Sequence, residues 1–358
     1  MVKKALFISL RSRSSLMTID AMKRFFDIVD DFDLRRIEVT TKESIKVSYD
    51  GKLLGGYDCI FIKGSFRYLS LLHAMAVAFE NKSYLPIRSK AFYLAHDKIL
   101  MHLFLAQHKI PMPKIYLATP VTAKRILENE VHYPVIIKLP NGTQGRGVIF
   151  AESYAAASSM LDAIIALKQP FLIQEYVETG GKDLRVFVIG NKVAAAMQRI
   201  AKKGEARANI HAGAKGKKVS VSEETSEIAV KVANLIDADI CAIDILESSK
   251  GPLVIEANIS PGLRGITAVT KKDIARDIAH FVYKKTGEFI EMKKKIESEK
   301  LLREELPKAE FGKQIITNLD FRGKRILLPE IATKASKFKE GEEVVVKIDE
   351  GKICVEKF

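Results

Sequence analysis

The chain has 358 residues, of which 47% are hydrophobic, and its 58 Lys and Arg outnumber 44 Asp and Glu for a formal charge of +14. This composition excludes a disordered or fibrous chain and predicts a globular protein of two or three domains. The positive charge favours anionic partners, which include phosphates, metabolites, acidic proteins and nucleic acid, without choosing among them.

The first predicted element is a buried strand over residues 5–10. Its apolar run imitates a signal peptide, but Arg11 and Arg13 end it too early. No later segment reaches the roughly 18 uninterrupted apolar residues that a membrane helix requires. Three cysteines stand alone in apolar stretches: Cys59, Cys241 and Cys354. We therefore expect a soluble, cytoplasmic protein without a membrane segment, disulfide framework or zinc site.

Residues 1–96 alternate between strand-length and helix-length apolar runs, which predicts an α/β unit. The run 58–63 has the length of a strand, and the run 69–80 has the length of a helix. Two loops, 11–15 and 63–67, follow predicted strands, and open α/β sheets bind ligands at such positions. Solvated basic loops are an equally good interpretation.

A glycine-rich loop separates predicted strands at 135–139 and 148–150. It contains Gly142, Gly145 and Gly147. Glycines let backbone N–H groups approach phosphate oxygens closely. The loop is neither a Walker A loop nor a dinucleotide fingerprint, because it lacks GK[ST] and joins two strands. A flexible hairpin is the simpler interpretation, but Lys138 at the end of an apolar strand favours a bound anion such as phosphate.

Several further elements are expected between residues 97 and 290. A helix begins at residue 97, strands are expected at 171–175, 184–189, 193–198, 241–246 and 252–257, and helices at 155–168, 222–236 and 271–286. Strands outnumber helices in this region. That balance favours an α+β architecture of facing sheets over a doubly wound sheet.

Three side chains with oxygen donors lie at the ends of apolar strands. Glu256 and Asn258 are two residues apart and share one face of a strand, where Asp244 of a neighbouring strand can meet them. Carboxylate and amide oxygens suit Mg2+, which keeps water and phosphate oxygens as its other ligands. Any one of these groups could pair with a surface lysine. The convergence of all three favours a metal site.

Arginines lie between the glycine-rich loop and these carboxylates. Arg199 and Arg207 could stabilise the charge that develops in phosphoryl transfer, or hold a carboxylate bidentately. Arg185 could as easily form a structural ion pair with Asp183. The basic, glycine-punctuated stretch 199–218 is typical of a mobile substrate loop and also of an ordinary solvated loop.

These segments together resemble the ATP-grasp ligases of the RimK group, which add glutamate or similar amino acids to a carboxylate. The matching segments occur in the family's order over about residues 1–290: His96-Asp97-Lys98, YPVIIKLPNGTQGRGV, Gln174-Glu175-Tyr176-Val177, DLRVFVIGNKV, RANIHAG and LVIEANISPG. The resemblance implies an α+β ATP-grasp fold, in which an α/β N-terminal unit precedes two α+β subdomains that clasp ATP. The chain departs from the pattern at Cys241-Ala242, where Gly-Val is common, and at residues 256–260, which leaves the exact substrate open.

The resemblance also implies a role for each matching residue. The ATP-binding residues would be Lys98 and Lys138 at the phosphates, Gly142, Thr143, Gln144, Gly145 and Gly147 in the loop above them, Glu175, Tyr176 and Val177 at adenine, Asp183 near the ribose, and Arg207 and Asn209 at the γ-phosphate. The catalytic residues would be Lys138, Arg199 and Arg207, with Arg199 holding the phosphoryl group or the acceptor carboxylate. The ligands of Mg2+ or Mn2+ would be Asp244, Glu256 and Asn258.

The C-terminal part begins with a charged helical linker at 291–308, and a small β unit is expected over 309–358 with a hairpin from Val344 to Val355. This unit resembles an AbrB-type swapped-hairpin domain, in which two chains interleave and bind DNA. Residues 291–358 hold 16 basic and 14 acidic side chains, and this near balance argues against strong duplex binding. We therefore expect the unit to dimerise or dock, giving a homo-oligomer, and nucleic-acid binding is the less favoured interpretation.

The sequence thus predicts an enzyme with domains at 1–96, 97–290, 291–308 and 309–358. It would use ATP to phosphorylate a carboxylate acceptor and couple the acyl phosphate to an amino-acid donor. A phosphotransferase acting on a small metabolite would use the same parts and is an alternative. A nucleic-acid-binding regulator with a non-catalytic ATP-grasp body is another, although the intact lysines and metal ligands argue against it.

Overall fold

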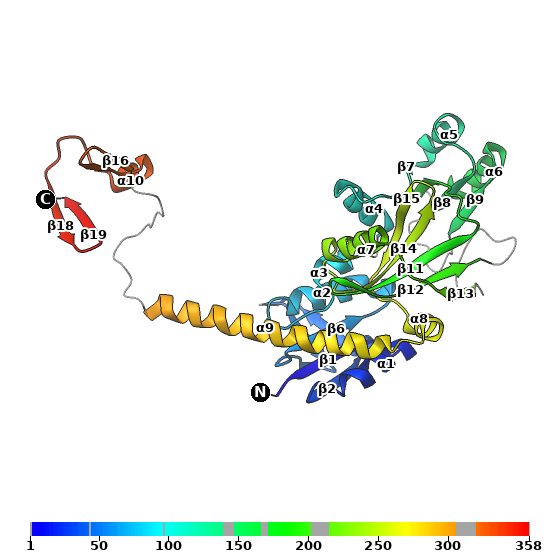
Figure 1. Cartoon of the computed structure of the whole chain (residues 1–358), viewed down its shortest axis with the longest axis horizontal. Helices are drawn as coiled ribbons and strands as arrows, with labels where there is room; N and C mark the ends of the chain where they lie inside the picture. Colours follow the sequence, from blue (N-terminus) through cyan, green and yellow to red (C-terminus); the bar gives the residue numbers. More distant parts are fainter. Residues whose placement is uncertain are drawn as a thin grey trace. The chain divides into compact units, whose positions relative to one another are not determined.

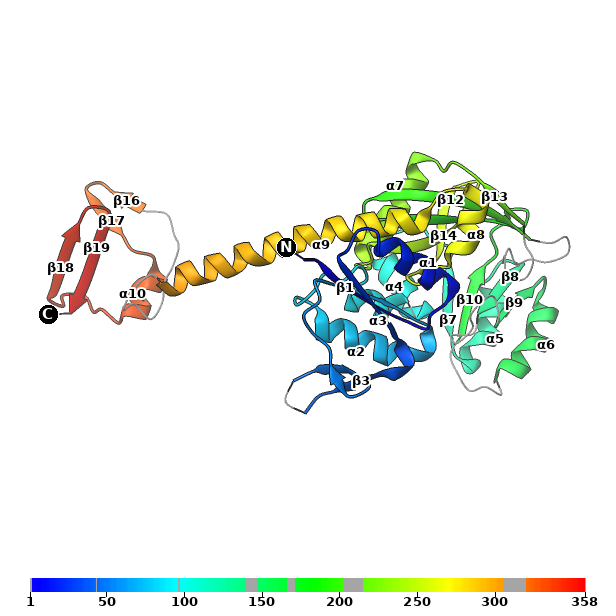
Figure 2. The same cartoon turned by 90° about the horizontal axis from the view of Figure 1, so that it is seen from below.

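A computed structural model describes residues 2–42, 44–95, 97–138, 147–165, 171–201, 215–305 and 320–357. The chain forms two compact units, Met1–Lys293 and Lys294–Phe358. Figures 1 and 2 show the elements of each unit from two sides. No helix in the described part of the chain is both long enough and apolar enough to cross a membrane.

The first unit begins with a parallel sheet in the order β2-β1-β6. Its strands are β1 (Lys4–Ser9), β2 (Ile28–Asp33) and β6 (Cys59–Lys63). The connecting elements are α1 (Arg13–Met22), η1 (Leu34–Arg36), η2 (Phe66–Tyr68), α2 (Leu69–Phe79), α3 (Ser89–Ala95) and a small antiparallel sheet of β3 (Ile37–Thr40), β4 (Lys46–Tyr49) and β5 (Lys52–Leu53). Because β1 and β6 are buried along almost their whole length, they read as continuous apolar runs, as the prediction assumed.

The two loops predicted in this unit are shorter than expected. Helix α1 already begins at Arg13, because the hydroxyl of Ser12 accepts a hydrogen bond from the backbone N–H of Ser15 at 3.2 Å and caps the helix. In the second loop a 3-10 turn begins at Phe66. The ends of β1 and β6 are therefore followed by short connections, and the one after β1 is capped by Ser12.

A second sheet is antiparallel, in the order β7-β10-β8-β9. It follows α4 (Lys98–Gln107) and consists of β7 (Ile115–Ala118), β8 (Val135–Lys138), β9 (Val148–Ala151) and β10 (Phe171–Glu175), with helices α5 (Pro120–Asn129) and α6 (Tyr154–Ile165). These elements enclose a hydrophobic core of their own. Lys138 lies opposite Val148 in the antiparallel β8–β9 pair, so the two predicted strands are confirmed, whereas the loop residues 139–146 lie outside the described residues.

A third sheet has five antiparallel strands in the order β13-β12-β11-β14-β15. They are β11 (Lys182–Ile189), β12 (Lys192–Ile200), β13 (Lys215–Lys218), β14 (Ile240–Ser248) and β15 (Gly251–Asn258). Helix α7 (Glu223–Leu235) packs on this sheet, and α8 (Leu263–Thr270) and α9 (Ile274–Glu305) follow it. The strands predicted in this region are all present.

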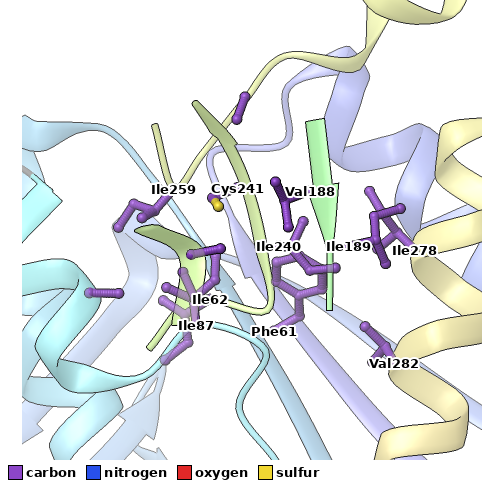
Figure 3. Close-up of a cluster of buried hydrophobic side chains, with 14 of the residues drawn as sticks. Phe61, Ile62, Ile87, Val188, Ile189, Ile240, Cys241, Ile259, Ile278 and Val282 are labelled. Carbon is purple, nitrogen blue, oxygen red and sulfur yellow. The ribbon is translucent and has the colours of Figure 1, made fainter. Parts of the chain in front are cut away.

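One hydrophobic core joins the parallel sheet to the five-stranded sheet. Figure 3 shows Phe61 of β6 beside Ile189 of β11, Ile240 of β14 and, from α9, Ile278 and Val282. Burial of this apolar surface is the main force that holds the two sheets together. The core is thus shared across residue 96, where the sequence had suggested a domain boundary.

The second unit is built from hairpins. Helix α9 is continuous across residue 290, where the predicted linker begins. After it the described elements are β16 (Asp320–Arg322), β17 (Arg325–Leu327), α10 (Glu330–Ser336), β18 (Val344–Asp349) and β19 (Lys352–Lys357). Ile348 lies opposite Ile353, which confirms the predicted hairpin.

Candidate functional site

A row of charged side chains crosses one face of the five-stranded sheet. Antiparallel pairing places Asp183 opposite Arg199, and it places Arg185 opposite Asp244. On the next strand, Glu256 lies opposite Asp244. Because residues two apart on a strand share a face, the row continues over β12, β11, β14 and β15.

The row is joined by ion pairs across the strands. Arg199 donates to both carboxylate oxygens of Asp183, at 2.6 and 2.7 Å, and Arg185 donates to both oxygens of Asp244, at 2.8 Å each. A second nitrogen contact places Arg199 Nη2 2.9 Å from Asp244 Oδ2. The ion pair between Arg185 and Asp183, which the sequence left open, is not formed. Two arginines and two aspartates instead make a neutral network.

Burial affects the two aspartates of this network differently. It raises the pKa of Asp183 to about 6, although Arg199 acts in the opposite direction. Burial also opposes ionisation of Asp244, but Arg185 and Arg199 together hold the pKa of Asp244 below its usual range. Of the two aspartates, Asp244 is therefore the one that stays ionised as the pH falls.

The two predicted phosphate lysines lie near the Glu256 end of this row. Lys138 ends β8, and its Nζ donates to Oε1 of Gln174 on β10 at 2.7 Å. Burial lowers the pKa of Lys138 to about 8, an effect that the Glu256 carboxylate opposes and the Lys98 ammonium reinforces. Neighbouring charges shift a pKa in this way only at short range. The structure thus brings together Lys98, Lys138 and Glu256 from three different elements.

His102 is a residue of this region that the sequence did not single out. It lies one turn after Lys98 in α4, and burial lowers its pKa to about 4, with a further contribution from the charge of Lys138. The imidazole is therefore neutral at pH 7 and adds no charge beside the lysines. A lone histidine in an apolar helix carries no metal-ligand spacing, so no sequence signal could have identified it.

The predicted metal ligands form a donor set that fits Mg2+. Glu256 is exposed, and within the described ranges no hydrogen bond or ion pair engages its carboxylate. Asp244 Oδ1 accepts a bond only from Arg185 Nε in these ranges, which leaves one lone pair for a cation. The Asn258 side-chain oxygen accepts a bond from the backbone N–H of Ser260 at 2.9 Å and also keeps a lone pair.

The composition of this donor set explains why no cluster of three acidic, histidine or cysteine side chains is found around it in the described residues. In the part of the chain that the structure describes, no three His, Cys, Asp or Glu side chains come together as a metal site. The predicted set contains only two such residues, because its third member is an amide. Three oxygen donors of this kind are the chemistry that Mg2+ prefers.

Part of the predicted nucleotide site lies outside the described residues: Gly142, Thr143, Gln144, Gly145, Arg207 and Asn209. Gly147, which leads into β9, has a φ of +72°, a left-handed conformation that favours glycine. Glu175 ends β10, and Tyr176 follows it with its ring 5.2 Å from that of Phe150. Val177 comes next, so these three residues form the exit from the second sheet.

The N-terminal sheet also reaches this region. Lys63, the last residue of β6, donates from Nζ to the carbonyl oxygen of Pro261 at 2.9 Å. Ser14 of α1 accepts a bond from the backbone N–H of Leu263 at 2.9 Å. The segment between these contacts and Asn258 is short, so the first unit's N-terminal elements hold the chain directly after the predicted metal ligands.

Comparison with known sequences identifies a family and relatives that this chain resembles. Residues 95–282 match the RimK-like ATP-grasp domain. A probable alpha-L-glutamate ligase of Thioalkalivibrio sulfidiphilus (strain HL-EbGR7) is 39% identical over 239 residues, which are 66% of this chain and 79% of that protein. A probable alpha-L-glutamate ligase of Hydrogenovibrio crunogenus (strain DSM 25203 / XCL-2) is 38% identical over 242 residues, 67% of this chain and 80% of that protein.

Solved structures show the same fold. The ATP-grasp ligase PsnB, complexed with a phosphomimetic variant of its minimal precursor, Mg and ADP, superimposes with a TM-score of 0.63 and 17% identity over 79% of this chain and 98% of that one. A RimK domain protein ATP-grasp from Sphaerobacter thermophilus DSM 20745 superimposes with a TM-score of 0.59 and 18% sequence identity. The superposition covers 78% of this chain and 98% of that one. The predicted α+β ATP-grasp fold is confirmed. With the sequence relatives, these findings show that the chain belongs to the RimK-like ATP-grasp family and is an ATP-dependent carboxylate–amine ligase.

Proposed function

We propose that this ligase adds glutamate, or a similar amino acid, to a carboxylate acceptor through an acyl phosphate. The names of the two relatives support glutamate as the amine. The observation that carries the proposal is the convergence of Lys98, Lys138 and Glu256, two cations beside a carboxylate. Such a group suits a nucleotide phosphate and its metal ion together.

Lys98 and Lys138 are the proposed partners of the ATP phosphates. Their charge would reduce the repulsion between an acceptor oxygen and the γ-phosphoryl group, and would stabilise the charge that develops in transfer. Arg207 and Asn209 are proposed at the γ-phosphate, the glycine-rich loop above it, and residues 175–177 at adenine. The family match over residues 95–282, which covers all of them, supports these assignments.

Asp244, Glu256 and Asn258 are the proposed ligands of Mg2+, and Mn2+ would suit the same oxygens. PsnB, a neighbour in fold, binds Mg and ADP. The metal, when bound, would supply positive charge at the phosphates. Arg185 and Arg199 already hold Asp244 in place, so this ligand is preorganised.

Arg199 is proposed to hold the transferring phosphoryl group or the acceptor carboxylate. Although burial opposes its charge, Asp244 and Asp183 keep the pKa of Arg199 above its ordinary value, so it stays a cation at any working pH. The proposed contact of Asp183 with the ribose would coexist with its two bonds to Arg199.

The second unit is proposed to pair with a second copy of the chain. None of its described hydrophobic side chains is buried, and Ile348, Phe321 and Ile353 are 78%, 58% and 58% exposed. A unit this small gains stability when such apolar strands are covered. The AbrB-like pattern supports a swapped hairpin as the form of pairing. A cytoplasmic location is also proposed, because the cysteines are free thiols.

A product assay tests the proposed reaction. The full chain, ATP and Mg2+ are incubated with single amino acids and carboxylate acceptors from a cell extract, and ADP and amide products are measured, the latter by mass spectrometry. We expect an amide with glutamate. Glu256→Gln should lower the rate more than about 100-fold, because it removes a charge from the metal site.

Glu247→Gln is the matched control, since Glu247 is an exposed glutamate on the neighbouring strand β14, and it should retain wild-type activity. Unchanged turnover in Glu256→Gln would show that Glu256 is not a ligand of the catalytic metal ion. A product that retains phosphate and gains no amine would contradict the proposed ligation.

A further inference from the structure

Lys63 is a cation that the proposed reaction does not yet use. It ends β6, and ligands of open α/β sheets bind at the carboxyl ends of their parallel strands. Its ammonium has three donors, but in the described ranges it makes a single hydrogen bond, to Pro261. No carboxylate there pairs with it. Burial alone lowers the pKa of Lys63 to about 8, and no nearby acid offsets the effect.

Lys63 contacts the segment that follows the proposed metal ligands. Pro261 lies three residues after the proposed metal ligand Asn258, and Ser14 holds the same segment from the other side through Leu263. Directly before Pro261, the hydroxyl oxygen of Ser260 is buried, without a hydrogen-bond partner in the described structure. An ammonium and a hydroxyl thus lie along one short segment with unused hydrogen-bonding capacity.

Two other lysines show what is unusual about Lys63. Lys272 also donates to a backbone carbonyl, that of Ala194 at 2.7 Å, but Lys272 is exposed, so water can satisfy its other donors. Lys138 is half-buried, as Lys63 is, but the charges of Glu256 and Lys98 act on the pKa of Lys138. Neither Lys98 nor Lys138 shifts the pKa of Lys63. Lys63, at the end of the N-terminal strand β6, therefore does not share the electrostatic environment of Lys98 and Lys138, and we expect it to bind a different anion.

We propose that Lys63, at the end of β6, binds a carboxylate of a ligase substrate next to the segment that follows Asn258. The inference rests on the proposed function, because both the amino-acid donor and the acceptor of that reaction carry carboxylates. A half-buried ammonium with unused donors gains most from an ionised acceptor, which forms short, charge-assisted hydrogen bonds. The bond to Pro261 then orients the ammonium, and the substrate carboxylate supplies the missing negative charge.

Steady-state kinetics of the full chain test this role. Lys63→Met should raise the KM for one carboxylate substrate by about 10- to 100-fold, the usual worth of a charged hydrogen bond, and leave the KM for ATP within about threefold. Lys63→Arg should recover most of the loss. Whether the KM of the donor or of the acceptor rises tells which substrate supplies the carboxylate. Lys272→Met is the matched control and should keep wild-type values.

A second variant separates charge from structure. Lys63→Gln retains an N–H donor for the Pro261 carbonyl but carries no charge, so it should show the same rise in KM with an unchanged melting temperature. If the donor carboxylate is the ligand, wild-type enzyme should prefer an amino acid over its α-carboxamide by about 10- to 100-fold, and Lys63→Gln should lose this preference.

The outcomes distinguish this inference from the proposed function. If amide product forms, and the KM of donor and acceptor and the preference for a carboxylate are all unchanged in Lys63→Gln, then Lys63 only ties β6 to Pro261 and the inference is wrong. If the wild-type enzyme forms no amide with any amino acid, the proposed function fails first and the inference fails with it.

Discussion

Lys138 shows how burial prepares a single side chain for an anion. In the free protein its ammonium is bonded to Gln174, and burial holds its pKa at about 8. A phosphate placed beside it would favour the charged form. Above pH 8, nucleotide binding must therefore be accompanied by uptake of a proton, and the affinity must depend on pH.

ATP affinity should accordingly fall as the pH rises above 8. The pKa of Lys138 in the folded protein lies below the ordinary lysine value of 10.5. Its side chain is therefore protonated and positively charged below about pH 8 and loses this charge as the pH rises above 8. Below pH 8 the Kd should be flat, and above it the Kd should rise towards tenfold per pH unit. Lys138→Arg keeps its charge and should give a flat Kd throughout. Titration calorimetry with MgATP measures both, and equal slopes for the two proteins would contradict the assignment.

Strand register decides the partners of the charged residues, and it could not be read from the sequence. Asp183 and Arg185 are neighbours on one strand, roughly 7 Å apart along it, whereas directly opposite residues lie about 5 Å apart. Each therefore pairs across the sheet, Asp183 with Arg199 and Arg185 with Asp244. The spacing of Glu256 and Asn258 within one strand was predictable, because it needs only the period of two.

At the scale of elements, apolar runs predicted most of the strands, and short capped elements were missed. The runs that became β1, β8, β14 and β15 are largely apolar and have the length of strands, so composition and length were sufficient to predict them. Helix α1 begins in a stretch of Arg and Ser that also suits a loop. Its N-cap at Ser12 and its contact with α8 come from the folded arrangement, which sequence alone does not show.

Helix α1 is held to α8 by one buried hydrogen bond, and removing it should destabilise the first unit. Ser14→Ala leaves the backbone N–H of Leu263 without its partner, and an unsatisfied buried donor costs about 1–3 kcal/mol of unfolding free energy. Ser226→Ala is the control, because the Ser226 hydroxyl makes one exposed hydrogen bond, to the carbonyl oxygen of Ser222 at the start of α7, so it should change stability by less than about 0.5 kcal/mol. Urea denaturation of both variants measures the difference. Equal denaturation midpoints for the two variants would show that the hydrogen bond between Ser14 and Leu263 does not contribute to stability.

At the scale of the whole molecule, all the proposed catalytic residues belong to the first unit. Its parallel and five-stranded sheets share one core, and the second sheet adds Lys138 from a core of its own. The second unit, Lys294–Phe358, contributes none of the described buried hydrophobic residues. Turnover should therefore depend on the first unit alone. Self-association is the property that the exposed strands of the second unit can affect.

Deletion of residues 307–358 separates these two properties. The proposed lysines, metal ligands and Lys63 all precede the deletion, and α9 is retained to Glu305, so ATP turnover with a small acceptor should stay within about threefold of the full chain. The exposed side chains of β18 and β19 are removed, so the truncated enzyme should show a lower mass per particle in light scattering, beyond the mass of the deleted residues. Replacing Ile348, which is 78% exposed, by Lys in the full chain is the matched test, because it should weaken self-association and leave turnover unchanged. If the truncated protein is folded by circular dichroism but turns over no small acceptor, the second unit completes the active site and the proposed division of roles is wrong.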